Sequence, residues 1–190
     1  MSALHAGSPI EEVAATVSEA LVAAGITAVL SGGAAVQIYS AGLYVSRDLD
    51  FVSPAGHREL DAVLRKLGYI RVSGRHYVND AVPYTLEFPP WPLAVGSELI
   101  RDWMELPVGQ MTVRILTPTQ CVMDRLAAFY FWRVWRGWGD TATSPSICVR
   151  LSYAEPMGGT DQLAQVTRLQ AAAARSSRGL HLDGSRIHAR

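Results

Sequence analysis

Cysteine, lysine and long apolar runs are scarce in this chain of 190 residues. Its two cysteines, Cys121 and Cys148, are too few for a disulfide framework, and we expect both to be reduced thiols. No stretch approaches the roughly 20 apolar residues needed to span a bilayer. The N-terminus also lacks the basic start and apolar core of a signal peptide. We therefore expect a cytoplasmic protein with no membrane partner.

Net charge is lacking as well, because 17 basic residues balance 17 acidic ones. The composition therefore gives no bulk electrostatic reason to expect nucleic-acid or membrane binding. The charges are unevenly distributed along the chain. Residues 1–132 carry 9 basic and 13 acidic side chains, and residues 133–190 carry 8 basic and 4 acidic ones. With 49% hydrophobic and 18% charged residues, the chain falls outside the disordered class.

Several common functional motifs are absent. The sequence has no Gly-Lys-Ser/Thr of a Walker motif and no Gly-x-Gly-x-x-Gly dinucleotide fingerprint. It has no Gly-x-Ser-x-Gly nucleophile elbow, and its five histidines show no ligand spacing. These absences weigh against the two corresponding phosphate-binding folds, a hydrolase elbow and a zinc site.

Helix and strand signals mix along the first two thirds of the chain and predict the α/β class. Helices are expected at 9–25, 34–40, 57–67 and 121–135. The last of these is preceded by the helix-start sequence Thr-Pro-Thr-Gln at 117–120. Strands are expected at 26–30, 46–52, 84–88, 104–107 and 111–116, with a hairpin at 69–78.

The most informative segment begins with Gly32 and Gly33, which follow an apolar run and precede a short helix. Such a turn offers free backbone N–H groups and the positive end of the helix dipole, which suits a phosphate. A tight strand-to-helix turn with no ligand is the alternative.

Asp48 and Asp50 follow after fourteen intervening residues. The period of a strand places both carboxylates on one face, within about 7 Å of each other at the backbone. Two such acids repel each other and raise each other's pKa, so the pair favours a bound cation. A strand end rich in solvated acids is the alternative. The sequence Asp-Leu-Asp-Phe-Val also fits the nucleophile motif of haloacid-dehalogenase-like phosphatases, but the only lysine, Lys66, is poorly spaced for that site.

Glu87 and Arg125 are two further candidates. Glu87 shares a strand face with Thr85, and three acids would converge if this strand paired beside the one carrying Asp48 and Asp50. Arg125 could reach the site from its helix and touch phosphate. A local or buried ion pair with Asp124 is the alternative for Arg125.

These motifs, in this order, resemble the nucleotidyltransferase superfamily. The matching core is Gly32-Gly33-x-Ala-Val, then Tyr39, then Ser46-x-Asp-Leu-Asp-Phe, and later Leu116-Thr-Pro-Thr before Asp124-Arg-Leu-Ala-Ala. It is most similar to small bacterial AbiEii-type toxins and minimal nucleotidyltransferase antitoxins, and covers about 28–132. The resemblance implies a nucleotidyltransferase-like mixed sheet flanked by helices.

The resemblance also implies roles for individual residues. Asp48 and Asp50 would bind Mg²⁺ or Mn²⁺, and Glu87 would complete the metal site or act as a base toward the attacking hydroxyl. The residues expected to bind nucleotide are Ser31, Gly32, Gly33, Ser46 and Arg125. The expected partners are an NTP, an RNA or protein acceptor, and a cognate toxin or antitoxin.

We therefore predict a nucleotidyltransferase-like domain over 1–135 and a partly helical or disordered C-terminal extension over 136–190. The function expected is magnesium-dependent transfer of a nucleoside monophosphate, in a toxin–antitoxin or phage-defence system. A catalytically weak module that binds nucleotide or a partner is the alternative. The intact set of three acids favours the enzyme, and the extension, which matches relatives poorly, favours the module.

Overall fold

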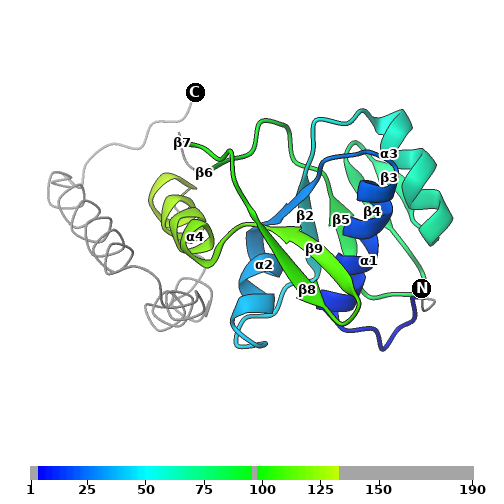
Figure 1. Ribbon diagram of the computed structural model, residues 1–190, viewed down its shortest axis with the longest axis horizontal. Coiled ribbons are helices and arrows are strands. Elements are labelled where there is room, and N and C mark those ends of the chain that lie inside the picture. The colour runs from blue at the N-terminus through cyan, green and yellow to red at the C-terminus, as the bar shows by residue number, and fades with distance from the viewer. Residues whose placement is uncertain (1–3, 96–97, 133–190) are drawn as a thin grey trace, which may run out of the picture. The chain divides into compact units, whose positions relative to one another are not determined.

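The computed structural model describes residues 4–95 and 98–132 (Figure 1). The predicted extension over 136–190 lies outside these residues, so the extension and the domain boundary after residue 135 remain predictions. Within the described residues, no helix is long and apolar enough to cross a membrane.

A mixed seven-stranded sheet carries the candidate residues, with strand order β3-β4-β5-β2-β1-β9-β8. Its strands are β1 (Val29–Ser31), β2 (Asp48–Val52), β3 (Ile70–Ser73), β4 (His76–Val78), β5 (Thr85–Glu87), β8 (Met104–Val108) and β9 (Met111–Ile115). Strand β2 runs parallel to β5, and β1 runs parallel to β9, while the other neighbours are antiparallel. A parallel pair needs a long connection, and α3 with the β3–β4 hairpin supplies it between β2 and β5.

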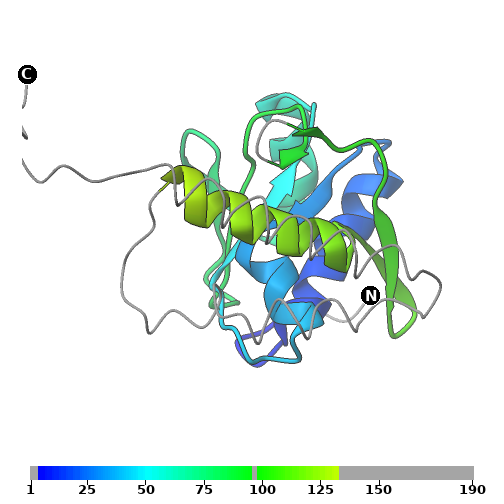
Figure 2. The same ribbon diagram turned by 90° about the vertical axis from the view of Figure 1, so that its left-hand side faces the viewer.

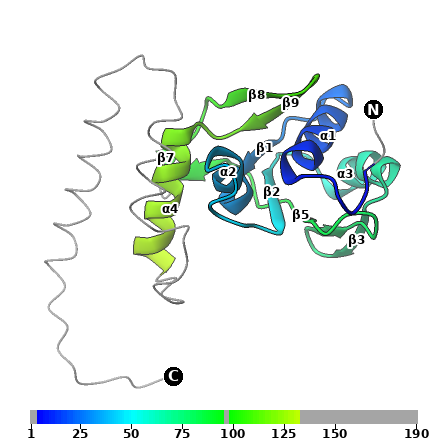
Figure 3. The ribbon, with the colours of Figure 1, turned by 90° about the horizontal axis from the view of Figure 1, so that it is seen from below.

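Four α-helices accompany the sheet in the described residues: α1 (Ile10–Ala23), α2 (Gly32–Tyr39), α3 (His57–Leu64) and α4 (Pro118–Trp132). A short 3₁₀ turn, η1 (Arg65–Leu67), extends α3. Helix α1 packs beside α3, and α2 packs against α4, β1 and β2 (Figures 1 and 3). Figure 2 shows α4 in front of α2, seen from the α4 side.

The alternation of side chains in β2 separates the core from the candidate site. Leu49 and Phe51 are fully buried, and they pack with Leu30, Leu86 and other apolar side chains of neighbouring strands. Asp48 and Asp50 alternate with them and therefore point to the opposite face of the sheet. The predicted split of β2 into an apolar and an acidic face agrees with this arrangement.

Local signals predicted most elements well. Before α4, the Thr117 hydroxyl accepts a hydrogen bond from the Gln120 N–H, and the Gln120 side-chain oxygen accepts one from the Thr117 N–H. This is the reciprocal capping box that the Thr-Pro-Thr-Gln sequence predicts. Helix α2 begins at Gly32, two residues earlier than expected, so both glycines lie in its first turn.

A second, two-stranded sheet of β6 (Ala94–Val95) and β7 (Glu98–Leu99) was not predicted. Each strand has two residues, which is too short for a period of two to show in the sequence.

Candidate active site

Four polar side chains lie side by side across four adjacent strands of the sheet. In the strand registers, Ser31 of β1 is opposite Asp50 of β2, Asp50 is opposite Glu87 of β5, and Glu87 is opposite His76 of β4. We call Ser31, Asp50, Glu87 and His76 the polar row. Strands β2 and β5 are thus direct neighbours, which was the condition for the three predicted acids to share one face.

Asp48 and Thr85 form a second pair on the same face, two residues before Asp50 and Glu87. The Thr85 hydroxyl donates a hydrogen bond to the Asp48 carboxylate. Asp48 is exposed to solvent, whereas Asp50 and Glu87 are half-buried. The structure therefore places two of the three acids directly opposite each other, with the third one step along β2.

The glycine turn lies against Asp50. Gly32 has a φ of +65°, and a Cβ atom built on it would overlap the Asp50 carboxylate. A Cβ atom on Gly33 would lie 2.9 Å from the Tyr44 ring and 3.0 Å from the Ser46 hydroxyl oxygen. Both positions are thus closed to larger side chains unless their neighbours move. The Ser31 side chain at the N-cap of α2 makes no capping hydrogen bond, and N–H groups in the first turn of a helix suit an anion.

The hydroxyls of Ser31 and Ser46, which were predicted to bind nucleotide, donate hydrogen bonds to backbone oxygens. The Ser31 hydroxyl donates to the Asp50 backbone oxygen at 3.2 Å, which ties β1 to β2. The Ser46 hydroxyl donates to the Asp48 backbone oxygen at 3.0 Å. The Ser46 N–H donates to the Gln37 side-chain oxygen at 2.6 Å, which holds the loop before β2 against α2. Both serines therefore help to fix the backbone around the acids.

Asp50 is the acid whose ionisation is most perturbed. Burial, together with the negative charges of Glu87 and Asp48, raises its pKa from 3.8 to about 6, while the charge of Arg125 acts in the opposite direction. The negative charges of Glu87 and Asp48 thus add to the effect of burial on Asp50, the acid beside the glycine turn.

Arg125 lies on α4 close enough to influence Asp50. Its guanidinium donates to the Asp124 carboxylate through Nε at 3.2 Å and Nη2 at 2.5 Å. The local ion pair, which was the alternative considered for Arg125, is therefore formed. Both members are half-buried, and both also act on the pKa of Asp50, in opposite directions.

The carboxylates of Asp48, Asp50 and Glu87 are chemically suited to a divalent cation, although Asp48 and Glu87 contact other side chains. Among the described residues, no three His, Cys, Asp or Glu side chains lie close enough to hold a metal ion. Asp48 is held by Thr85, and the Glu87 carboxylate lies 3.7 Å from the His76 ring. Carboxylates are nevertheless the ligands that Mg²⁺ prefers, and a half-buried acid repelled by two others gains from a nearby cation. The chemistry of Asp48 and Asp50 therefore suits a divalent cation.

Three side chains near the acids were not singled out from the sequence: His76, Tyr44 and Gln37. The position of His76 opposite Glu87 depends on the register of the β4–β5 pair, which no local pattern encodes. Tyr44 and Gln37 reach Gly33 and Ser46 because the loop after α2 folds back on that helix. The one sequence signal for any of the three was that Tyr44 is an aromatic residue in a glycine-containing loop.

No family model matches this chain, and no curated protein matches it significantly in sequence. Solved structures do resemble it. An antigenic nucleotidyltransferase-like protein from Paracoccidioides brasiliensis superposes with a TM-score of 0.62 at 16% identity, covering 93% of this chain and 91% of that chain.

ANT(2")-Ia, solved in complex with adenylyl-2"-tobramycin, superposes with a TM-score of 0.54 at 15% identity. That match covers 88% of this chain and 98% of ANT(2")-Ia. At such identities the likeness concerns the arrangement of helices and strands. The mixed sheet flanked by helices is therefore a nucleotidyltransferase-like fold.

Proposed function

We propose that this protein is a nucleotidyltransferase that moves a nucleoside monophosphate from an NTP to an acceptor hydroxyl, with Mg²⁺ or Mn²⁺ bound. The observation that carries this proposal is the polar row next to the glycine turn. It brings together a helix N-terminus, an acid with a raised pKa (Asp50) and a second acid (Glu87) on one face of adjacent strands. The nucleotidyltransferase-like fold agrees with it.

In this proposal the glycine turn holds the phosphates that leave. The first-turn N–H groups of α2, from Gly32 and Gly33 onward, bind the β- and γ-phosphates, and Arg125 adds positive charge from α4. Asp48 and Asp50 hold the metal ion. When bound, that ion offsets the charge that develops on the pyrophosphate.

Glu87 is proposed to act as the base. The acceptor oxygen attacks the α-phosphorus, the new O–P bond forms, and the bond from phosphorus to the bridging oxygen of pyrophosphate breaks. The electron pair of that bond leaves with pyrophosphate, and the acceptor proton passes to the Glu87 carboxylate. Glu87 suits this role because it is half-buried and directly opposite Asp50.

The acceptor is proposed to be a hydroxyl of RNA, of a protein or of a small molecule. ANT(2")-Ia, whose structure holds an adenylylated tobramycin, provides a precedent for a small-molecule hydroxyl on this fold. The sequence resemblance to AbiEii-type toxins and minimal nucleotidyltransferases favours a macromolecular acceptor and a toxin–antitoxin context.

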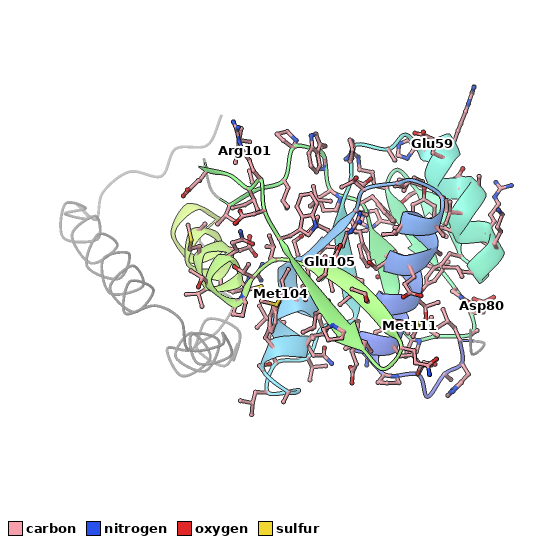
Figure 4. The ribbon with its side chains drawn as sticks, viewed as in Figure 1. Glu59, Asp80, Arg101, Met104, Glu105 and Met111 are labelled. Atoms are coloured by element: carbon pink, nitrogen blue, oxygen red, sulfur yellow. The ribbon has the colours of Figure 1, made fainter. Side chains whose placement is uncertain are left out.

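A labelling experiment tests the reaction. The full chain is incubated with each α-³²P-labelled NTP, Mg²⁺ and cell extract, beside Asp48→Ala and Asp50→Ala. We expect label in RNA, protein or a small product with wild type and a loss of labelling in both variants. Asp80→Ala is the matched control, because Asp80 is an exposed acid on the turn after β4 (Figure 4).

Two results would contradict the proposal in different ways. Equal labelling by wild type and both variants would refute the metal site. If no NTP gave label, but Mg²⁺ and NTP together raised the melting temperature, the nucleotide-binding module would replace the enzyme.

For the biological context, we propose that the chain acts with a cognate toxin or antitoxin. Its expression alone would then slow growth or protect cells from a neighbouring gene product. Growth curves of cells that express the wild type or Asp50→Ala test this, and identical curves under all conditions would count against it.

A further inference from the structure

His76 belongs to the polar row but has no part in the proposed reaction as described so far. It is the direct cross-strand partner of Glu87, and its ring Nε2 lies 3.7 Å from Glu87 Oε1. The His76 side chain is 50% exposed and the Glu87 side chain 39% exposed. An ion pair at such exposure adds little to stability, so stability does not explain the pairing.

The backbone fixes these two residues opposite each other. On one side of the pair, the Phe88 N–H donates to the Arg75 carbonyl oxygen at 3.1 Å, and the Arg75 guanidinium donates to the Phe88 carbonyl oxygen at 3.0 Å. On the other side, Tyr77 is opposite Leu86, and both are buried. Because a shift of one residue would turn these apolar side chains to the wrong face, the register of His76 and Glu87 is strongly specified.

Strand β4 is itself anchored to α3. The Tyr77 hydroxyl donates to the Asp61 carboxylate at 2.9 Å, and the Tyr77 ring packs edge-on against Phe88 with centroids 5.5 Å apart. The guanidinium of Arg71 on β3 also binds Asp61, through Nε at 3.1 Å and Nη2 at 3.2 Å. These contacts lie on the face of the sheet opposite His76, so they hold β4 to α3 while His76 faces the candidate site.

The polar row also has a direction. Ser31 and the glycine turn lie at one end, and His76 lies at the other, three strand spacings or roughly 14 Å away. If the leaving phosphates occupy the glycine end, the attacking hydroxyl must arrive from the opposite side of the α-phosphorus. That side is the Glu87–His76 end of the row.

We propose that His76 is a positioning residue that holds the Glu87 carboxylate toward the acceptor end of the row. Glu87 then accepts the proton of the acceptor hydroxyl and does not serve as a metal ligand. This inference rests on the proposed function and deepens it, because it names the residue that holds the proposed base in place. It also places the acceptor over β4 and β5.

Steady-state kinetics of nucleotidyl transfer test the positioning role. A misplacement of a reacting group by about 1 Å can cost about 100-fold in rate, so His76→Ala should lower kcat by up to about that factor. The KM for NTP should not change, because the phosphate end of the row is intact. His76→Gln keeps an N–H donor and should restore most of kcat. His57→Ala, an exposed histidine at the start of α3, is the matched control.

Mn²⁺ binding, followed by electron paramagnetic resonance in the absence of NTP, gives a second readout that needs no activity. We expect Mn²⁺ to bind wild type, Glu87→Gln and His76→Ala with similar affinity, and to bind Asp50→Asn far more weakly. Loss of Mn²⁺ binding in Glu87→Gln alongside Asp50→Asn would overturn the inference, as would wild-type kcat in His76→Ala. If wild type itself bound no Mn²⁺, the metal site of the proposed function would fail, and this inference with it.

Discussion

Replacing Gly32 by alanine is expected to damage the candidate site more than the fold. Gly32 combines a φ of +65° with a Cβ direction that points into the Asp50 carboxylate. Alanine would therefore be strained at this position and would also force Asp50 to move. The two effects can be separated, because Gly25 has a similar φ of +73° but no atom within 4 Å of the position of its Cβ.

The expected magnitudes follow from these two environments. A left-handed conformation costs a non-glycine residue about 1–2 kcal/mol, and both Gly25→Ala and Gly32→Ala should lose this amount of stability. Gly32→Ala must also push the Asp50 side chain away from its rotamer, which adds about 0.5–1.5 kcal/mol. The difference between the two variants should thus be about 1 kcal/mol. Mn²⁺ binding should be lost in Gly32→Ala alone.

Urea denaturation gives the free energies of unfolding, and electron paramagnetic resonance gives the Mn²⁺ affinities. Equal destabilisation of the two variants, with Mn²⁺ binding retained in Gly32→Ala, would refute the packing of Gly32 against Asp50. Loss of Mn²⁺ binding in Gly25→Ala would show that a general loss of stability, and not contact with Asp50, is responsible.

Two further substitutions concern stability. Burial and the neighbouring acids raise the pKa of Asp50 to about 6 in the folded state, against its ordinary value of 3.8. The folded state therefore binds more protons between these values, and stability falls as the pH rises through them. Asp50→Asn should therefore raise the free energy of unfolding by up to about 3 kcal/mol at pH 8, with no gain below pH 4, as urea denaturation across this range would show. A flat difference with pH would contradict this. The Tyr69 hydroxyl is buried and finds no hydrogen-bond partner among the described residues, so Tyr69→Phe should keep or raise stability, by about 1 kcal/mol. A fall in melting temperature would show that the hydroxyl is satisfied.

Local chemistry made much of the fold predictable. The alternation of acids with Leu49 and Phe51 predicted both the strand and its two faces, because only one face of β2 is packed in the core. The Thr117 and Gln120 side chains predicted the start of α4, since the capping box is formed by residues three apart in sequence. Signals of this kind act over a few residues and can therefore be read from the chain directly.

Pairing between distant segments was not predictable in the same way. Glu87 was a conditional candidate because the sequence around it does not indicate that β5 pairs with β2. His76 was missed since its relation to Glu87 depends on a hairpin and a loop that set the β4–β5 register. The start of α2 at Gly32 also differs from the prediction, because glycine is normally a poor helix residue. Its φ of +65° and the close approach of Asp50 explain glycine at this position.

The parallel pairing of β2 with β5 divides the candidate site into two parts of different origin. The glycine turn and the aspartate pair come from one continuous stretch of twenty residues, 31–50, in which α2 and β2 constrain each other. Glu87 and His76 belong to a separate excursion of the chain through α3 and the β3–β4 hairpin. Under the proposed function, insertions or substitutions in that hairpin would remodel the surface proposed for the acceptor, while the end of the row proposed for the phosphates keeps its geometry. The specificity for the acceptor could then change while the residues proposed to bind the nucleotide keep their places.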